Sequence, residues 1–373
     1  MVIVVDTRFA EANGPADDSD WTVRQFRQMA RLYPQRQFVL IGSQPWPTGH
    51  FSEPNMVVVT AGPPAHRYRL LQYWYNFRLP ALLRKYKAAV FVCPGNHGSL
   101  YTKVPQCLLT KDLPHLQYPK WVPKTQIRFA ATNQQRFFNK ATRIIASSQY
   151  CADAIKEGFG GNAAKLQVVY PGVASVFCPA SYEQQAAVRE EYTNGTAYFL
   201  YVGHLLPQHN LMNLRRAFSQ FKKMQKSSMQ LLLVGHNLWP KDELAQSLKS
   251  YKYRNDVKLL GHLPLAETAR LMAAAYALVQ PAELPGFALP PLEAMQCGVP
   301  VIVTATGALP EICGPAALYA ADGSTNELAT QMMLVFKDES LRAEKIAAGL
   351  EQVKQFEAHH ALQQLAQAVM GTA

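Results

Sequence analysis

The residues best suited to chemistry lie in the segment 276–304, where a short apolar run is followed by a turn and then by a helical stretch. Gly286 lets backbone amides turn inward with no side chain in the way. Pro290 and Pro291 fall at the start of the helix, where a missing N–H costs little. The free amides and positive dipole end of this helix favour a phosphate or a sugar hydroxyl. Glu293 comes one turn later, and it either points at the same ligand or only faces water.

A second segment suited to chemistry is GHLLPQHN, residues 203–210. A turn at Gly203 can present backbone amides to an anion. His204, Gln208 and His209 follow it, and the imidazoles titrate near pH 6.5. If the two histidines hold a phosphate, we expect affinity for that anionic ligand to rise below about pH 6.5.

The first half of the chain places a cation beside a carboxylate at a comparable point. Lys111 and Asp112 come directly after the apolar run 106–109. Lysine can donate a hydrogen bond and hold an anion, but near neutral pH it is a poor base unless its pKa is lowered. His97 follows another apolar run, residues 89–92, where a site and a structural turn are equally consistent with the pattern.

A glycine-containing loop follows the first apolar run, residues 2–5. Gly14 stands there in the sequence Asn-Gly-Pro-Ala, and three carboxylates come close behind it: Asp17, Asp18 and Asp20. Because carboxylates repel an anion, we interpret this acidic stretch as a surface loop, with a bound metal or cationic ligand as the alternative.

These segments are positioned by short apolar runs that alternate with helical stretches such as 23–32, 68–86 and 124–140. The runs are rich in Val, Ile and Leu without polar alternation, which is typical of parallel strands buried on both faces. We expect strands at residues 2–5, 38–41, 56–59, 89–92, 106–109, 143–146, 167–170, 198–202, 230–234, 257–260, 277–280, 299–303 and 317–319. The pattern predicts an α/β protein with doubly wound sheets.

The order of these elements predicts two Rossmann-like domains that face each other across a ligand-binding cleft. Residues 171–197 contain Pro, Ser and Gly with no strong period, which favours a linker. We therefore place a first domain at 1–175, a linker at 176–196 and a second domain at 197–355.

Composition excludes several other classes of protein. The 373 residues are 49% hydrophobic and 17% charged, so the chain can bury a large core and is not mainly disordered. It has no run of about 18 apolar residues and no signal-peptide pattern, so we expect neither a membrane span nor secretion. None of the six cysteines forms a C-x-x-C pair, which excludes a zinc ribbon and favours a reducing, cytoplasmic setting.

The excess positive charge is confined to the first half of the chain. Residues 1–180 hold 21 Lys and Arg against 9 Asp and Glu, whereas residues 181–373 hold 16 against 17. Such asymmetry indicates an anionic partner, an anionic membrane surface, or only a solvated face. Nucleic acid is not expected, because the chain has no zinc finger, RRM or helix-turn-helix signature.

The segment 286–301, GFALPPLEAMQCGVPV, resembles the donor-site signature E-G-F-G-L-P-P-L-E-A-M-A-C-G-x-P-V of the group 1 glycosyltransferases, glycosyltransferase family 4. The resemblance extends over nearly the whole chain. It includes TKVPQCLLTKDLPHLQYPKWVP, TRIIASSQYCADAIKEGF, VVYPGVASVFCP, YVGHLLPQHNLMNLRRAF, VKLLGHLP and GALPEICGPAALY, within residues 102–319. It implies the GT-B fold, with a last helix at 356–373 that crosses back to the first domain.

The resemblance implies a nucleotide-sugar donor as substrate, retention of anomeric configuration and no required metal ion or other cofactor. Glu293 takes the place of the family glutamate that binds the ribose, and His262 lies near the place of the nucleobase. The positions implied for the rest of the donor are Gly14, Gly203, His204, Gln208, His209, Gly286, Phe287, Ala288 and Leu289. Lys111, Asp112 and Glu283 are the candidates for contact with the transferred sugar and the acceptor.

Several working positions depart from the family pattern. Pro285 replaces the family's first glutamate, with Glu283 two residues earlier, and Lys111 stands where the family has histidine. His204 and His209 replace permanent cations of the phosphate-binding loop. Two functions therefore stay open: transfer of a sugar to a glycan, lipid-linked or small-molecule acceptor, and a catalytically inactive relative that binds a partner.

A peripheral contact with an anionic membrane is compatible with either function. Two stretches interleave aromatic and basic residues: 74–87, with Trp74, Tyr75 and Phe77, and 120–143, with Trp121 and other aromatics. They favour helices at the inner face of the cell membrane, or helices whose aromatics only face the core.

Overall fold

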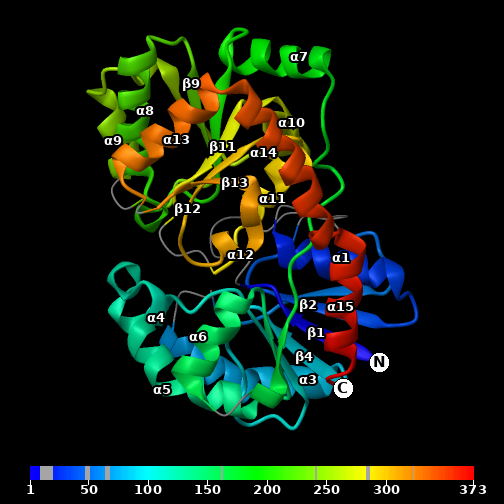
Figure 1. The fold of residues 1–373 in the computed structure, drawn as a ribbon. Helices are drawn as coiled ribbons and strands as arrows, with labels where there is room; N and C mark the ends of the chain where they lie inside the picture. Colours follow the sequence, from blue (N-terminus) through cyan, green and yellow to red (C-terminus); the bar gives the residue numbers. More distant parts are fainter. Residues whose placement is uncertain are drawn as a thin grey trace. The chain divides into compact units, whose positions relative to one another are not determined.

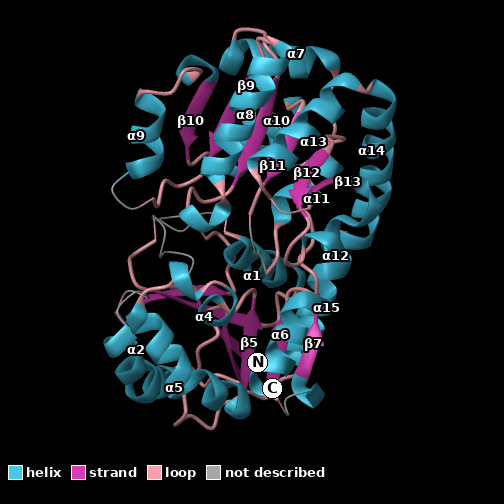
Figure 2. Cartoon of the chain, turned by 60° about the vertical axis from the view of Figure 1, so that its left-hand side comes forward, coloured by secondary structure: helices cyan, strands magenta, loops and turns pink. Residues whose placement is uncertain are grey.

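The computed structural model describes residues 1–8, 20–46, 51–63, 68–160, 163–239, 242–282, 286–321 and 323–373. The chain forms two compact units, shown in Figure 1. The first contains Met1–Pro171 and His359–Ala373, and the second contains Gly172–Ala358. Each unit is a parallel sheet with helices on both faces (Figure 2), so the predicted α/β class with two Rossmann-like domains is confirmed.

The first sheet has the order β3-β2-β1-β4-β5-β6-β7. Its strands are β1 (Val2–Asp6), β2 (Gln37–Gly42), β3 (Met56–Thr60), β4 (Val90–Cys93), β5 (Gln106–Thr110), β6 (Arg143–Ala146) and β7 (Leu166–Val168). All neighbouring strands are parallel. The strand order reverses between β1 and β4, which is where ligands bind in folds of this kind.

The helices of the first unit are α1 (Trp21–Leu32), α2 (Tyr68–Tyr73), α3 (Leu79–Lys85), α4 (Pro114–Gln117), α5 (Lys124–Lys140), α6 (Gln149–Phe159) and α15 (Ala358–Met370). A π-helical turn, Trp74–Arg78, joins α2 to α3. Alternate residues of each strand face opposite sides, so Ile3 packs with α1 and α15 while Val4 packs with α2, α3, α5 and α6. The C-terminal helix α15 therefore completes the core of the first unit.

The second sheet has the order β10-β9-β8-β11-β12-β13. Its strands are β8 (Tyr198–Val202), β9 (Gln230–Val234), β10 (Val257–Gly261), β11 (Ala277–Gln280), β12 (Val301–Thr304) and β13 (Ala317–Ala320). The helices are α7 (Tyr182–Thr193), α8 (Leu211–Gln225), α9 (Glu243–Lys249), α10 (Leu265–Ala274), α11 (Leu289–Gln296), α12 (Leu309–Cys313), α13 (Thr325–Lys337) and α14 (Glu339–Gln352). These strands are also parallel, and the order reverses between β8 and β11.

The interpretation of residues 176–196 as a linker differs from the structure, which forms α7 there. Ser181 and Gln184 close a capping box at its start. Arg189 donates to the carbonyl of Ala274 over 3.1 Å, and Tyr192 donates to Glu267 over 2.7 Å, so α7 packs on α10. The exposed side of α7 is polar, which is why its hydrophobic period was too weak to predict it.

Two further expectations from composition can be compared with the structure. No helix in the described parts of the chain is long and apolar enough to span a membrane. All six cysteines are free thiols, and five of them are buried, as expected of reduced core residues; Cys178 is exposed.

Candidate functional site

Three neighbouring strands of the second sheet end in the same pair of residues. Gly203-His204 follows β8, Gly235-His236 follows β9, and Gly261 closes β10 before His262. The amide of Gly203 donates to Val234 over 2.9 Å, and the amide of Gly235 donates to Gly261 over 2.8 Å. These bonds continue the sheet one step beyond its strands and fix the carboxyl edge.

The backbone at this edge leaves no room for side chains at two of the three glycines. Gly203 and Gly235 have φ of +147° and +143°. A Cβ atom on Gly235 would lie 1.9 Å from the carbonyl oxygen of Gly203, and a Cβ on Gly203 would lie 2.9 Å from the hydroxyl of Tyr201. Backbone without side chains at the carboxyl edge of a parallel sheet commonly binds a phosphate group in Rossmann-like folds.

The three histidines form a row along this edge. The ring centroids of His204 and His236 are 5.9 Å apart, and those of His236 and His262 are 4.1 Å apart with nearly parallel planes. The sequence analysis identified His204 and His262 but missed His236. The repeated Gly-His pair after three apolar runs was a signal that could have revealed it.

His209 lies in the turn that leads into α8, where Tyr201 and His204 hold its ring. Its Nδ1 is 2.6 Å from the carbonyl oxygen of His204 and 2.8 Å from the hydroxyl of Tyr201. A carbonyl can only accept, so Nδ1 carries the proton. Burial lowers the pKa of His209 below its usual 6.5, so the ring is neutral at neutral pH. Its Nε2 is then an acceptor, and the imidazole ring becomes a cation only under acidic conditions. Gln208 is half-buried in the same turn.

The second part of the predicted donor site is at the start of α11. Ala288 is the N-cap residue, and Pro290 and Pro291 occupy the first turn. The segment Gly286–Leu289 is buried or half-buried. Glu293 is only 6% exposed, so the alternative that it merely faces water is wrong. A buried carboxylate one turn into this helix is positioned to receive hydroxyl donors.

Several predicted residues lie outside the described part of the chain: Gly14, Asp17, Asp18, Glu283 and Pro285. Asp20 of the acidic stretch is described, and it caps α1 by accepting from the amides of Thr22 and Val23 at 2.8 and 3.1 Å. This cap satisfies orphan amides at the start of α1, so Asp20 serves the fold.

In the first unit, Lys111 and Asp112 follow β5 at the carboxyl edge of the sheet. The ammonium of Lys111 lies 5.3 Å from the ring centroid of Trp21 at the start of α1. Asp112 accepts from the hydroxyl of Tyr118, and its backbone carbonyl accepts from Asn96 over 2.7 Å. Burial raises the pKa of Asp112, while the Tyr118 hydrogen bond opposes that shift. Asp112 is thus held by its neighbours, whereas Lys111 carries the nearby positive charge.

The sequence analysis missed a buried ion pair at the end of β1. Arg8 and Asp6 are both 0% exposed and lie 2.7 Å apart. The hydroxyl of Tyr75 donates to Asp6 over 2.5 Å, and the Arg8 guanidinium lies 3.6 Å from the ring centroid of Trp74. Arg8 and Tyr75 together hold the pKa of Asp6 below its usual value against the effect of burial.

His97, which follows β4, is enclosed by aromatic rings. Its ring stacks on Tyr75 at 5.7 Å and lies 5.3 Å from the centroid of Phe129. Its Nδ1 is hydrogen-bonded to the carbonyl of Gly95. Burial lowers the pKa of His97 to about 4, so the ring is neutral at physiological pH. Of the two roles left open for His97, this enclosure favours the structural one.

The predicted membrane-facing stretches are partly core. Trp74 and Tyr75 are 3% and 0% exposed, because the π-helical turn directs them onto the sheet. Phe77 and Trp121 are exposed, and so are Tyr73 and Tyr101, which the sequence analysis did not single out. The ring centroid of Phe77 lies 5.3 Å from that of Tyr73 and 6.0 Å from that of Tyr101, so these three rings form one exposed row.

Comparison with known proteins identifies the class. The model for "Glycosyltransferase Family 4" matches residues 22–177, and the model for "Glycosyl transferases group 1" matches residues 184–352. Solved structures share the GT-B fold over the whole chain. Sucrose-phosphate synthase from Thermosynechococcus elongatus has a TM-score of 0.81 at 18% identity, covering 100% of this chain and 98% of that one. HepE of Anabaena in complex with UDP-glucose has a TM-score of 0.79 at 19% identity, covering 100% of both.

Several of the relatives in sequence are mannosyltransferases by name. O-antigen chain mannosyltransferase B of Escherichia coli is 28% identical over 78% of this chain and 75% of its own length. The Salmonella typhimurium O-antigen chain mannosyltransferase RfbU is 26% identical over 66% and 64%. A GDP-mannose-dependent phosphatidylinositol monomannoside mannosyltransferase of Corynebacterium glutamicum is 27% identical over 54% of each.

The two family matches together span most of the chain, and the fold agrees with them. This protein belongs to the group 1 glycosyltransferases, glycosyltransferase family 4. It is a glycosyltransferase of GT-B fold, and the alternative of a non-catalytic relative gains no support from these similarities.

Proposed function

We propose that this glycosyltransferase transfers mannose from GDP-mannose to the saccharide end of a growing surface polysaccharide, with retention of anomeric configuration. Two O-antigen mannosyltransferases and a GDP-mannose-dependent enzyme among its relatives support the sugar, the base and the acceptor class. The observation that supports the donor site is the edge at Gly203 and Gly235. A Cβ on Gly235 would lie 1.9 Å from the carbonyl oxygen of Gly203, so this edge has room for backbone only.

The nucleotide part of the donor is held in this proposal by residues of the second unit. The diphosphate lies against the bare backbone after Gly203 and against backbone amides at the start of α11, which are oriented before the reaction and cost no reorganisation during it. Glu293 accepts hydrogen bonds from the ribose hydroxyls. The row of imidazoles at His204, His236 and His262 offers flat surfaces and nitrogen atoms beside the base.

The chemical step needs the departing diphosphate to be stabilised while an acceptor hydroxyl approaches the anomeric carbon. The leaving phosphate itself takes the acceptor proton, so no side chain has to act as a strong base. Lys111 contacts the sugar or the acceptor through hydrogen bonds that its side chain donates. Asp112 is held by Tyr118 and Asn96, and it orients the loop that carries Lys111.

No metal ion is part of this proposal. The described residues contain no group of three or more His, Cys, Asp or Glu side chains arranged to hold one. The test is activity after exhaustive chelation: unchanged turnover is expected, and loss of turnover that Mg²⁺ or Mn²⁺ restores would overturn this part.

The acceptor is proposed to be lipid-linked, which would bring the protein to the cytoplasmic face of a membrane. The exposed row of Tyr73, Phe77 and Tyr101 supports this, because aromatic side chains favour the membrane interface. The N-terminal half also carries the excess of positive charge. Co-sedimentation with anionic vesicles is expected to exceed that with neutral vesicles, and Phe77→Ser should reduce it. Equal sedimentation with both kinds of vesicle would contradict the proposal.

The donor is tested with the purified protein. Calorimetric titration with GDP, UDP, ADP and TDP should give tightest binding for GDP, and incubation with GDP-mannose and a polysaccharide primer should release GDP. The product linkage, read by NMR, should keep the donor's anomeric configuration. If another nucleoside diphosphate binds more tightly than GDP, the proposed base is wrong. If none of the four binds, the proposed donor site is refuted.

A further inference from the structure

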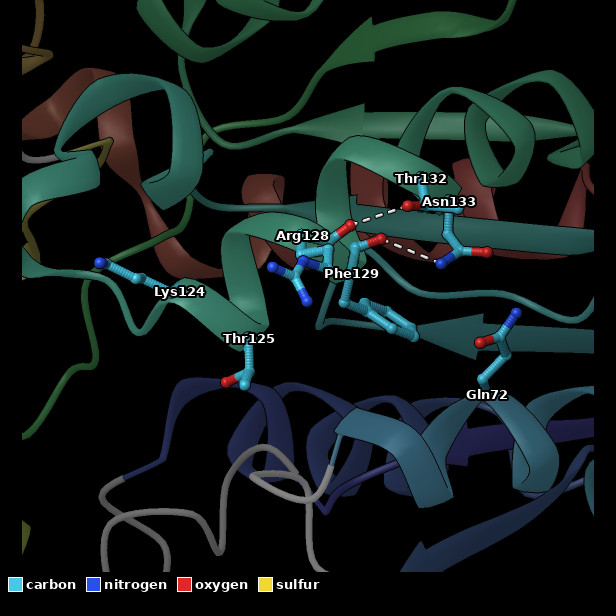
Figure 3. Close-up of a pocket in the computed structure, with 7 residues that line it drawn as sticks. All are labelled: Gln72, Lys124, Thr125, Arg128, Phe129, Thr132 and Asn133. Carbon is cyan, nitrogen blue, oxygen red and sulfur yellow. Dashed lines mark hydrogen bonds between the residues drawn. The ribbon is translucent and has the colours of Figure 1, made fainter.

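The first unit contains a cavity of about 310 Å³ between α2 and α5, to which none of the roles above has been assigned. Figure 3 shows the residues that line it. Lys124, Arg128 and Thr132 follow one another at four-residue spacing, so they lie along one side of α5. Gln72 of α2 faces them, and Phe129 and Asn133 lie deeper.

One wall of the cavity carries positive charge. Lys124 and Arg128 are exposed, and no carboxylate among the described residues forms an ion pair with either of them. Unbalanced cations at the mouth of a cavity favour an anionic group there.

A buried hydrogen-bond acceptor on the same wall favours a ligand group that donates hydrogen bonds. Asn133 is 2% exposed, and its Nδ2 donates to the carbonyl of Phe129 over 3.0 Å. This bond fixes the carboxamide, because a flipped amide would place two oxygens against each other. The remaining Oδ1 is buried and has no hydrogen-bond partner. In Figure 3 this oxygen is turned away from Phe129, on the side of Gln72.

Thr132 adds to this acceptor character. Its hydroxyl already donates to the carbonyl of Arg128 over 2.9 Å, so it can only accept from a further group. A ligand that satisfies the whole cavity therefore brings an anion for Lys124 and Arg128 and hydroxyl donors for Asn133 and Thr132. Inorganic phosphate alone lacks enough donors, and a neutral sugar lacks the charge.

The wall of the cavity is connected to Asp112, the neighbour of Lys111, through the loop that follows β4. Phe129 lies 5.3 Å from the ring of His97. Gln134, in the next turn of α5, donates to the carbonyl of Asn96 over 2.9 Å, and Asn96 donates to the carbonyl of Asp112. The helix α5, which forms one wall of the cavity, is thus in contact with the loop that follows β4.

We propose that the cavity between α2 and α5 binds an anionic, hydroxylated part of the acceptor: a sugar that bears a phosphate or a carboxylate. The proposal rests on the proposed function, because it extends the acceptor side of the same transferase. Arg128 and Lys124 pair with the anionic group, Asn133 and Thr132 accept from the sugar hydroxyls, and the ring of Phe129 contacts the apolar face of the sugar.

The proposal is tested by binding to the full chain with GDP present in excess, so that the donor site is filled. The probes are glucose 1-phosphate, glucuronate, glucose and inorganic phosphate. At least one of the two anionic sugars should bind about tenfold or more tightly than glucose and than inorganic phosphate. Preference for glucose 1-phosphate assigns a phosphate source, and preference for glucuronate assigns a uronic acid. Equal binding of all four probes, or no binding, overturns the proposal.

Variants separate the cavity from other sites. Arg128→Gln should weaken binding of the preferred anionic sugar by about tenfold or more, because a charge-assisted hydrogen bond is lost. Arg136→Gln, which removes an exposed cation two turns further along α5, is the matched control and should bind as the unaltered protein does. Equal loss in both variants, or no loss in either, would show that the cation is not part of a site.

Asn133→Leu provides a readout that a structural role would not produce. Because the variant removes an unsatisfied buried oxygen, its melting temperature should be unchanged or higher. Its preference for the anionic sugar over inorganic phosphate should disappear. If Asn133→Leu keeps that preference, the hydroxyl part of the proposal fails. GDP release from GDP-mannose is measured in parallel, so that failure of donor turnover, which concerns the proposed function, is distinguished from failure of this cavity to bind.

Discussion

Gly235 lies so close to Gly203 that a Cβ atom on Gly235 would stand 1.9 Å from the carbonyl oxygen of Gly203. The two glycines end neighbouring strands, β8 and β9, and both have positive φ. The close approach makes the carboxyl edge of the second sheet a surface of backbone alone. That surface is what the donor diphosphate requires in the proposed function, and it can be disrupted by a single methyl group.

Gly235→Ala should damage this edge in two ways, through a steric clash with Gly203 and through backbone strain at φ of +143°. We expect a loss of roughly 3 kcal/mol in the free energy of unfolding, since overpacking and strained dihedrals each cost about 1–3 kcal/mol. For a unit of this size that is a fall in melting temperature of roughly 6–12 °C. GDP binding should be lost at temperatures where the variant is still folded.

The control is Gly261→Ala on the next strand, where φ is +72° but nothing lies within 4 Å of the added Cβ. Only backbone strain of about 1–2 kcal/mol is expected there. Thermal unfolding and GDP calorimetry on both variants check the prediction. Equal effects at the two positions would show that the contact with Gly203 is unimportant.

His209→Lys should tighten GDP binding at about pH 7.5 by roughly tenfold, because a permanent cation replaces a neutral ring. The unaltered protein should gain affinity only as the pH falls below about 6.5, because burial lowers the pKa of His209 and protonation is needed for it to attract phosphate. The variant should show little of this pH dependence. Calorimetry with GDP between about pH 5 and pH 8 measures both. A flat profile for the unaltered protein would remove His209 from the phosphate site.

Glu293→Gln should weaken GDP binding by about 10- to 100-fold, because a charge-assisted hydrogen bond to a ribose hydroxyl becomes a neutral one. Glu293 is only 6% exposed, so a nucleotide that reaches it is removed from water there. Glu344→Gln, on the exposed side of α14, is the control and should bind GDP normally. If Glu293→Gln binds GDP normally and only melts at a different temperature, Glu293 belongs to the fold and not to the donor site.

Much of the fold could be predicted from hydrophobic runs alone. The strand predictions 198–202 and 230–234 coincide with β8 and β9, since strands buried on both faces leave uninterrupted apolar runs. The direction of aromatic residues in helices could not be predicted in the same way. Trp74 and Phe77 stand in one short segment, yet Trp74 is 3% exposed and Phe77 61%. The π-helical turn that separates them leaves no pattern in the residue types.

The candidate site shows a similar limit. The sequence placed His204 and His262 by motif, but the stacking of His236 on His262 depends on the order of three strands, which no local pattern encodes. Arg8 was missed because a lone arginine after a strand usually faces water. Its burial follows from Asp6 two residues earlier, which becomes a partner only because both side chains lie at the same end of β1.

The stability of the first unit should fall with pH between about 6.5 and 4 because of His97. Burial lowers the pKa of His97 to about 4, so the unfolded chain takes up this proton first as the pH falls. The free energy of unfolding should fall by up to about 3 kcal/mol over this window. Burial raises the pKa of Glu53, but hydrogen bonds from Arg27 and Arg31 outweigh it and lower the pKa to about 2. Glu53 therefore contributes its own loss only below about pH 4.5.

His97→Phe tests this assignment, since it keeps an aromatic ring between Tyr75 and Phe129 and removes the titrating group. Urea unfolding at several pH values should show a smaller slope for the variant between about pH 6.5 and pH 4. A slope as steep as that of the unaltered protein would place the proton uptake on another group.

The ion pair of Arg8 and Asp6 should be structural, and breaking it should be more costly than removing it. Arg8→Met leaves the fully buried Asp6 carboxylate with the Tyr75 hydroxyl but without its cation, and we expect a loss of about 3–5 kcal/mol. The double variant Asp6→Leu/Arg8→Met removes both charges and should recover much of that loss, because no charge is then left buried. Urea unfolding of the two single variants and the double variant gives the coupling energy. A loss below about 1 kcal/mol for Arg8→Met would mean that water reaches Asp6 in solution.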